Sequence, residues 1–350
     1  MPSLEDLYMP IGEQEMGEWC SSYASPPFTN VVAEVGGDYE SSYSRRKRAG
    51  SRLINVQPSC PVYAYGWAEQ HYAQVYSREW APYNIAMDED VLLWIGGNGL
   101  SYDERILLIK NLGLFSAVHT LVANNLVLAI YQHIACHECR QYLLRQAFEE
   151  TLHIRACRYI IDMLDLECDE DFYTNHHVPA SIRKAEWIYP LTRHLRNPYF
   201  EPNMALDSQK LIKELVAFYI IFKGVFFYIR FIQMLAMEQS NKMVGTSRQF
   251  KQILQDRYAH IAFGVDVINQ IKLDNPALWA PAFKAELAEM IHRAVMMEIG
   301  TLHDTSLQDG FGKDANKLAE HLKSKANQYC VQIGLPERYS QASNQFSWMI

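Results

Sequence analysis

The sequence lacks an excess of positive charge. Its 350 residues include 32 Lys and Arg against 40 Asp and Glu, which gives a formal net charge of −8. Nucleic acids and anionic membranes attract basic surfaces, so a mildly acidic chain is a poor match for either. We therefore expect no nucleic-acid partner and no membrane partner.

Cysteine is scarce, and its number is odd. Seven cysteines spread over the chain do not form the disulfide framework of a small secreted protein. The motif Cys136-x-x-Cys139 has no second cysteine pair, so we expect no zinc site there. The first ten residues contain Glu5 and Asp6 and lack the apolar run of a signal or transit peptide. These absences together predict a protein of the reducing cytoplasm.

The sequence also lacks the marks of β-structure, because it has no hairpin turn between alternating segments and no strand–helix alternation. From about residue 67, apolar residues recur at helical spacing instead. The helices that we predict run over 67–77, 103–134, 138–166, 184–196 with a kink at Pro190, 207–245, 246–272, 281–303 and 313–333. Four of them are long and have short or medium connections. This predicts one all-α domain over residues 61–350, an antiparallel bundle with additional helices.

Residues 1–60 lack any lasting helical or alternating period and are rich in Ser, Gly, Pro and Tyr. We predict a flexible N-terminal extension. The basic run over residues 45–48 could also act as a nuclear signal or a phosphate-binding patch, and we prefer the extension.

One long apolar run is present. Residues 215–237 are almost entirely apolar and have the length of a bilayer span. Lys223 and Arg230 lie near the middle, where each would cost roughly 2.5–3.5 kcal/mol at a bilayer centre. We therefore predict a helix that is buried on all sides inside the protein rather than a membrane span.

A Glu-x-x-His pair, Glu150 and His153, lies on the predicted helix 138–166. The i, i+3 spacing places both side chains on one face of the helix. The pair alone is a weak signal. It gains weight if other long helices supply partners, as in bundles that hold two metal ions with two lone carboxylates and two such pairs.

Seven segments carry a family resemblance: residues 121–131, 138–153, 224–228, 241–243, 256–260, 263–266 and 346–349. In these segments the chain resembles the radical-generating small (beta) subunit of class I ribonucleotide reductase. It looks closest to the subgroup that has lost the usual radical tyrosine. The resemblance implies a ferritin-like fold, a homodimer formed through the long helices, a role in deoxyribonucleotide synthesis for DNA replication, and a dinuclear Fe or Mn/Fe centre.

The family's six metal-ligand positions fall on His119, Glu150, His153, Lys223, Arg257 and His260. Only Glu150, His153 and His260 match the family's residue types. The position of the radical tyrosine is Cys157. A buried thiol that behaves as a small hydrophobic group is the preferred interpretation of Cys157, and a thiyl radical or a Lys–Cys cross-link is the alternative.

Two basic residues at ligand positions change the chemistry. A divalent metal would meet like charge at roughly 4 Å, and Fe and Mn prefer oxygen ligands. We expect Lys223 and Arg257 to pair with Glu150 instead, with Asp256 as a second anion. The prediction is a degenerate site with no dinuclear centre and no cofactor. A single Zn or Cu ion held by His119, Glu150, His153 and His260 remains the alternative.

The resemblance also implies a hydrogen-bonded relay for electron transfer, whose family positions fall on Trp80, Asp256 and His153. Tyr258 is a further candidate in the same segment as Asp256. One interpretation is that a radical still leaves the core through these residues. The other is that they are kept for packing, because a buried indole needs a partner for its N–H group and Asp256 balances Arg257.

Family members usually continue into a C-terminal tail that docks on the large catalytic subunit, whereas this chain stops one residue after Met349. This puts the partnership with the large subunit in doubt, although a truncated chain would look the same.

Three functions stay open. The first is a structural or regulatory partner that is not an enzyme by itself and dimerises with itself or with a ligand-complete small subunit. The second is an active beta subunit with an unconventional radical store. The third is a ferritin-like enzyme that uses Lys223 in a repurposed cavity.

Overall fold

The computed structural model describes residues 53, 65–96, 99–121, 127–166, 179–194, 197, 200, 205–304 and 315–340. The chain divides into two units, Met1–Ala49 and Gly50–Ile350, and all of these residues lie in the second. Every regular element in these ranges is a helix, so the prediction of an all-α bundle is confirmed. The segment 346–349 lies outside the described residues.

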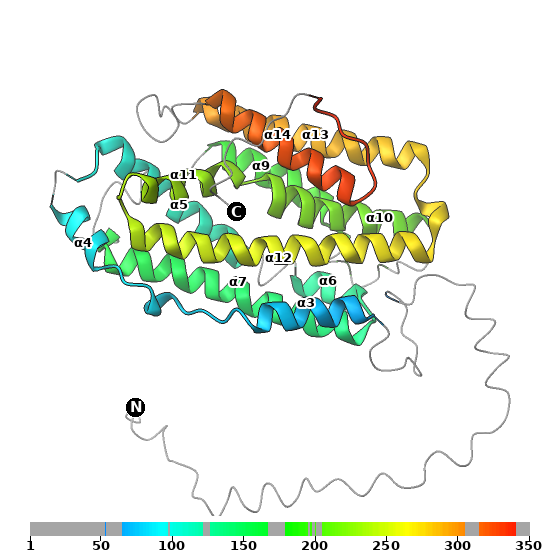
Figure 1. The fold of residues 1–350 in the computed structure, drawn as a ribbon. Coiled ribbons are helices and arrows are strands. Elements are labelled where there is room, and N and C mark those ends of the chain that lie inside the picture. Colours follow the sequence, from blue (N-terminus) through cyan, green and yellow to red (C-terminus); the bar gives the residue numbers. More distant parts are fainter. Residues whose placement is uncertain are drawn as a thin grey trace, which may run out of the picture. The chain divides into compact units, whose positions relative to one another are not determined.

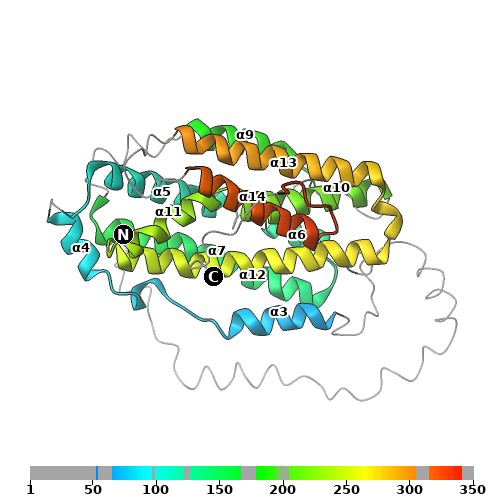
Figure 2. The ribbon, with the colours of Figure 1, turned by 45° about the horizontal axis from the view of Figure 1, so that its top comes forward.

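The helices are, in chain order, α3 (Gly66–Tyr76), η2 (Pro82–Asn84), α4 (Asp88–Ile95), α5 (Tyr102–Leu121), α6 (Leu128–His133), α7 (His137–Met163), α9 (Pro179–Leu191), α10 (Ala205–Leu215), η5 (Val216–Val225), α11 (Tyr228–Gln239), α12 (Val244–Asp274), η6 (Pro276–Leu278), α13 (Pro281–Asp304) and α14 (Ala315–Gln332). The long helices α7 and α12 lie side by side, and α3 runs along α7 (Figure 1, Figure 2). The π-helix η5 packs against α10, α12, α13 and α14, and so lies in the core.

The apolar run is buried, as predicted. Asp207–Gln239 is the one stretch among the described residues that is long and apolar enough to cross a membrane, with a mean hydropathy of 1.9, and its apolar window is entirely inside the bundle. An apolar run with no polar face needs burial on all sides, and the neighbouring helices supply it.

The same run is not one helix, which corrects the prediction of a continuous helix over 207–245. Its middle, η5, has π-helical hydrogen bonding, and the amide of Phe226 donates to the carbonyl of Ile221 at 2.8 Å. Phe227 then adopts a left-handed conformation with φ of 68°, which separates η5 from α11. A π-helical turn is uncommon and often marks a functional site.

Helix α12 starts where a buried aspartate caps it. Both carboxylate oxygens of Asp90 accept hydrogen bonds from the first turn, from the amides of Gly245 at 3.0 Å and Thr246 at 2.7 Å. Asp90 belongs to α4, a helix that the sequence analysis did not predict. This contact fixes the start of the helix that carries Asp256, Arg257 and His260.

Two other predicted helices differ in their bounds. The helix predicted over 184–196 is α9, which begins five residues earlier and ends at Leu191, so Pro190 lies inside its last turn. The helix predicted over 103–134 corresponds to α5 and α6, and residues 122–126 between them lie outside the described residues.

Part of the predicted N-terminal extension packs on the bundle. Leu53 is fully buried, and its carbonyl accepts hydrogen bonds from the amides of Ala135 at 2.8 Å and Cys136 at 3.3 Å, just before α7. The boundary at residue 60 stays a prediction, but the packed body includes Leu53.

Candidate functional site: a buried centre between three helices

Seven ionisable side chains meet inside the bundle, and each is less than a tenth exposed. They come from α7 (Glu149, Glu150, His153), η5 (Lys223) and α12 (Asp256, Arg257, His260). Spacings of three and four residues turn the members on each long helix toward the core. His119 lies on α5, and its side chain is outside the described residues.

Lys223 and Glu150 form the middle of this centre. The Lys223 ammonium donates to Oε1 of Glu150 and lies 3.0 Å from Nδ1 of His260. The predicted pairing of Lys223 with Glu150 is therefore present. Burial lowers the pKa of Lys223 below its usual value, and the carboxylate of Glu150 opposes this shift.

Arg257 does not pair with Glu150, which corrects the prediction. Its guanidinium donates to the backbone carbonyls of Phe222, at 3.1 Å, and of Lys223. It also lies over the ring of Phe231 at 5.1 Å. The carbonyls are at the end of η5, where the helix breaks and leaves acceptors for it. Burial lowers the pKa of Arg257 to about 10.

Each of the two histidines in this centre is oriented by a carboxylate behind it. Nε2 of His153 lies 2.9 Å from Asp256, and Nε2 of His260 lies 2.7 Å from Glu149. The Nδ1 atoms of both rings face Glu150, at 3.6 Å and 3.3 Å. Burial disfavours the charged form of His153, but the carboxylates of Asp256 and Glu150 outweigh it and raise the pKa of the ring.

Glu149 is the site residue that sequence reasoning missed. Its second oxygen accepts a hydrogen bond from Arg145 at 2.8 Å, one turn earlier on α7. The sequence signal that could have identified Glu149 is its position next to Glu150 in a helix with a buried face. Two neighbouring carboxylates point to different faces of a helix, so both can be buried only if each has its own partner.

The three predicted relay residues are in contact. The indole N–H of Trp80 donates to Oδ2 of Asp256 at 3.0 Å, and the same oxygen is the partner of His153. The Trp80 ring also stacks on the His153 ring. Burial alone would raise the pKa of Asp256, but its hydrogen bond with His153 and the neighbouring histidines lower it. Asp256 therefore hydrogen-bonds His153 and Trp80. It does not pair with Arg257, which corrects that part of the prediction.

Cys157 and Tyr258 lie beside this centre rather than in it. Cys157 is fully buried one turn after His153, and burial raises the pKa of its thiol to about 12, so it is an uncharged thiol at neutral pH. Tyr258 is partly buried near Tyr228, whose hydroxyl lies 2.8 Å from Nε2 of His321. The structure does not bring Tyr258 to the ionisable cluster.

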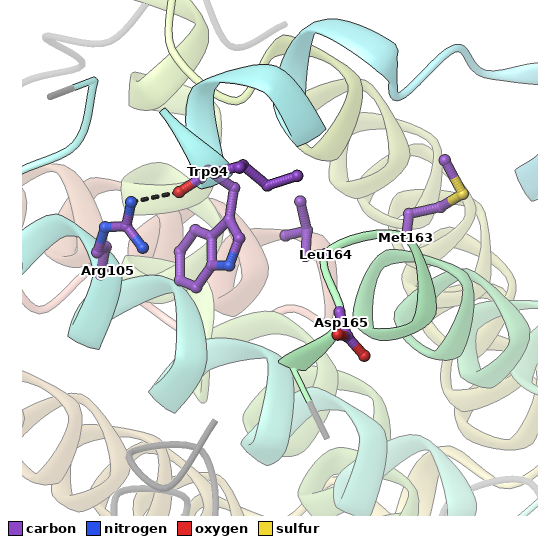
Figure 3. A pocket seen from close by; sticks show the side chains of 6 residues that line it. Trp94, Arg105, Met163, Leu164 and Asp165 are labelled. Carbon is purple, nitrogen blue, oxygen red and sulfur yellow. Dashed lines mark hydrogen bonds between the residues drawn. The ribbon is translucent and has the colours of Figure 1, made fainter. Parts of the chain in front are cut away.

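A surface pocket of about 530 Å³ lies elsewhere, where α4 and α7 end and α5 begins. Figure 3 shows Arg105 donating to the backbone carbonyl of Trp94. The walls are Trp94, Ile95, Arg105, Met163, Leu164 and Asp165. None of the predicted site residues lines it.

Among the residues that the structure describes, no three or more His, Cys, Asp or Glu side chains are grouped so as to hold a metal ion. The predicted single-ion set includes His119, whose side chain is outside this part of the chain.

Comparison with known proteins places the bundle in a family. A family model described as "Ribonucleotide reductase, small chain" matches residues 61–345. The chain belongs to this family. It is 36% identical over 307 residues to the ribonucleoside-diphosphate reductase subunit beta of Chlamydia pneumoniae, covering 87% of this chain and 88% of the relative. The subunit beta of Treponema pallidum is 24% identical over 87% of this chain and 83% of its own length.

Solved structures of ribonucleotide reductase proteins share the fold. A putative class I ribonucleotide reductase from Bacillus halodurans aligns with a TM-score of 0.71 at 19% identity, covering 81% of this chain and 99% of the other. The yeast Rnr4 homodimer structure aligns with a TM-score of 0.68 at 17% identity, covering 88% and 91%. The predicted fold of the ribonucleotide reductase small-subunit type is thus confirmed.

Proposed function

We propose that this ribonucleotide reductase small-subunit homologue has replaced its dinuclear metal centre with a buried ion-pair centre. It generates no radical of its own and acts in the cytoplasm as a structural or regulatory partner in deoxyribonucleotide synthesis. The observation that carries the proposal is the position of the Lys223 ammonium, which contacts Glu150 and His260. These are two of the three residues that match the family's ligand positions.

The charges support a centre without two metal ions. At the ligand positions that the structure describes, Glu150 is the single carboxylate, and Lys223 and Arg257 are cations. A divalent ion about 4 Å from the Lys223 ammonium would be repelled by about 8 kcal/mol at an effective dielectric constant of about 20. The donor set therefore does not fit a dinuclear iron or manganese centre.

The residue at the position of the radical tyrosine also supports the proposal. Cys157 is a fully buried thiol without a phenol ring, and its raised pKa keeps it protonated. A buried, protonated cysteine behaves as a small hydrophobic group. We infer that the chain keeps no tyrosyl radical at this position.

The proposed partner is a second copy of this chain or a ligand-complete small subunit. One of the similar solved structures is described as the Rnr4 homodimer from yeast, which supports self-association. A subunit that generates no radical can contribute to a reductase only through its surfaces, and a mixed dimer with an active subunit would use them.

One observation favours a second candidate, an active beta subunit with an unconventional radical store. The hydrogen bonds that join Trp80, Asp256 and His153 are intact. An organic radical signal in electron paramagnetic resonance, together with reductase activity after addition of a large subunit, would support this candidate over the first.

Metal analysis tests the first proposal. The full chain is purified aerobically beside a ligand-complete small subunit, and both are analysed by mass spectrometry for iron, manganese, zinc and copper. We expect two ions per chain in the control and far less than one in this protein. Two iron or manganese ions per chain of this protein would refute the proposal.

Mixed-dimer formation tests the partner. The chain is co-expressed with a ligand-complete small subunit that carries a different tag, and the assembly is weighed by native mass spectrometry. We expect mixed dimers whose reductase activity, with a large subunit, differs from that of the active homodimer. If only separate homodimers form, the regulatory role through a mixed dimer is wrong.

A further inference from the structure

The start of α7 holds two cysteines three residues apart, and the proposed function uses neither. Cys136 directly precedes the helix, and Cys139 lies in its first turn. We propose that the two form a redox-modification site, which a low-molecular-weight disulfide oxidises to an internal disulfide and a thiol reductant reopens. Glu150 follows Cys139 by eleven residues, roughly 16 Å along the helix, so this site is separate from the buried ionic centre. It does not depend on the metal content of that centre.

The backbone holds the two cysteines at the distance that a disulfide needs. The carbonyl of Cys136 accepts a hydrogen bond from the amide of Arg140 at 3.0 Å, so residues 136–140 already form a helical turn. Cα atoms three residues apart in such a turn are about 5 Å apart. Disulfides join Cα atoms about 4.4–6.8 Å apart, so the bond needs no large movement of the backbone.

The two side chains also approach each other. A side chain in the position before a helix reaches toward the residue three places later, as capping boxes show. The pKa of the Cys139 thiol is raised, and the side chain of Cys136 is the largest cause, ahead of burial. Both cysteines are free thiols, 3% and 0% exposed. The structure thus contains an adjacent dithiol in its reduced form.

Oxidation explains this pair better than metal binding does. Structural zinc sites need four ligands, commonly from two cysteine pairs or from a cysteine pair and two histidines. In the part of the chain that the structure describes, no three His, Cys, Asp or Glu side chains are grouped so as to hold a metal ion. Disulfides that form in a reducing cytoplasm are usually transient and serve catalysis or redox sensing. The pair is therefore best explained as a redox-sensitive dithiol.

Glu138 connects the pair to the residue before α3. Its Oε2 accepts a hydrogen bond from the Cys136 thiol at 3.0 Å, and its Oε1 accepts one from the amide of Tyr65 at 3.0 Å. A disulfide sulfur has no proton to donate, so oxidation removes the first of these bonds. Because the carboxylate is buried, the loss of this donor is costly. Oxidation therefore weakens the contact between the start of α7 and Tyr65.

Local opening gives an oxidant access to the buried pair. The contacts at the start of α7 come from single residues that precede the long helices. The carbonyl of Leu53 accepts hydrogen bonds from the amides of Ala135 and Cys136, and Tyr65 donates to Glu138. Such contacts open at a lower free energy than the helices of the core. We therefore expect oxidation to be slow and limited by this opening.

The reaction consists of two thiol–disulfide exchanges. The thiolate of Cys136, the more exposed of the two cysteines, attacks a small disulfide, forms a mixed disulfide and releases the first small thiol. Cys139 then attacks the sulfur of Cys136 and releases the second small thiol. Two electrons pass to the small disulfide, and the two cysteine protons end on the two released thiols. A dithiol reductant reverses both steps.

Thiol trapping tests the pair in the full-length protein. Reduced protein is incubated with increasing ratios of oxidised to reduced glutathione, quenched with acid, unfolded, alkylated and mapped by mass spectrometry. We expect an internal disulfide between Cys136 and Cys139, roughly tenfold more abundant than any disulfide of the isolated buried thiols Cys157 and Cys330. If the pair carries only glutathione adducts, or is oxidised no more than the isolated thiols, the proposal is wrong.

Three variants assign the roles. Cys136→Ser keeps a hydroxyl donor for Glu138 at a position where serine caps helices well, and it should abolish the internal disulfide. Cys139→Ala should stop the reaction at a mixed disulfide on Cys136. Cys330→Ala removes a buried cysteine on α14 and should leave the yield unchanged. A Cys139→Ala protein that accumulates no mixed disulfide would show that Cys136 is not the attacking thiol.

Hydrogen exchange tests the connection through Glu138. The amides of Tyr65 and Ala135 are followed by mass spectrometry in reduced and oxidised wild type. We expect both to exchange about threefold faster or more after oxidation, whereas the middle of α12 should not change. Reduced Cys136→Ser, which keeps the donor to Glu138, should exchange like reduced wild type. Equal exchange in both redox states would overturn the proposed weakening of this contact.

Discussion

Lys223 and Glu150 are both fully buried, so each supplies the main opposite charge that balances the other in the core. A buried ion pair often contributes little over an apolar pair of the same volume, but removal of one partner is costly. The pair therefore adds little net stability, but the loss of either residue alone destabilises the fold.

This dependence predicts the effect of Glu150→Gln. We expect the free energy of unfolding to fall by about 3–5 kcal/mol, because the Lys223 ammonium loses its anion. Lys223→Met/Glu150→Gln should lose less than Glu150→Gln alone. The measurement is urea unfolding of each variant, compared at equal m-values.

An exposed pair provides the control. Glu286 pairs with Lys213 on the surface, and Glu286→Gln should change the free energy of unfolding by no more than about 1 kcal/mol. If Glu150→Gln is no more destabilising than this control, the buried pair does not have the role that its position indicates.

Helices η5 and α12 approach each other closely where a glycine faces an aromatic ring. A Cβ atom at Gly264 on α12 would lie 2.0 Å from Cγ of Tyr219 on η5, which is far too close. The glycine is thus needed for the π-helix to lie against the helix that carries His260.

The expected result of Gly264→Ala is a loss of about 1–3 kcal/mol in stability, because the Tyr219 ring or the backbone must move. Gly300→Ala on α13 is the matched control, since nothing lies within 4 Å of its added Cβ. Alanine is the better helix former, so the control should gain up to about 1 kcal/mol. Thermal unfolding of both variants measures the difference, and equal effects would contradict the packing argument.

Helical periodicity was sufficient to predict the long amphipathic helices. The bounds of α7, α12 and α13 lie within three residues of those predicted. Periodicity fails for the run over 207–239, because a segment buried on all sides has no polar face that could reveal a π-turn or a break. The cap by Asp90 was missed for a different reason: it joins residues that are 155 and 156 positions apart.

The candidate site could be predicted in part. The resemblance named Glu150, His153, Lys223, Asp256 and His260, and the structure brings them together. The hydrogen-bond partners of Arg257 were not predicted, because they are backbone carbonyls that become available only where η5 ends. Ion-pair reasoning from the sequence counts side-chain charges and does not see such acceptors.

For the whole molecule, one buried histidine on α14 links stability to pH. Burial lowers the pKa of His321 to about 4, and nearby Lys325 adds to the effect. The ordinary pKa of about 6.5 applies in the unfolded chain. Between these two values the unfolded chain binds a proton that the folded chain does not, so stability falls as the pH falls through this window.

His321→Gln should therefore flatten the dependence of stability on pH between 4 and 6.5, and leave it unchanged above 6.5. Urea unfolding at pH 7 and at pH 5 measures the change for both proteins. Tyr228 keeps a hydrogen-bond partner in this variant, which limits the loss at pH 7. An identical slope for variant and wild type would exclude His321 as the source.

Arg257 donates hydrogen bonds to two backbone carbonyls at the end of η5. These hydrogen bonds restrict how a dinuclear centre could return in evolution. A glutamate that replaced Arg257 first would place its negative charge beside these carbonyl oxygens, while the ammonium of Lys223 still occupied the centre. Replacement of Lys223 alone would leave the buried carboxylate of Glu150 without its cation, which is also costly. A lineage that regained metal would have to change both positions, and we expect neither single change to be neutral.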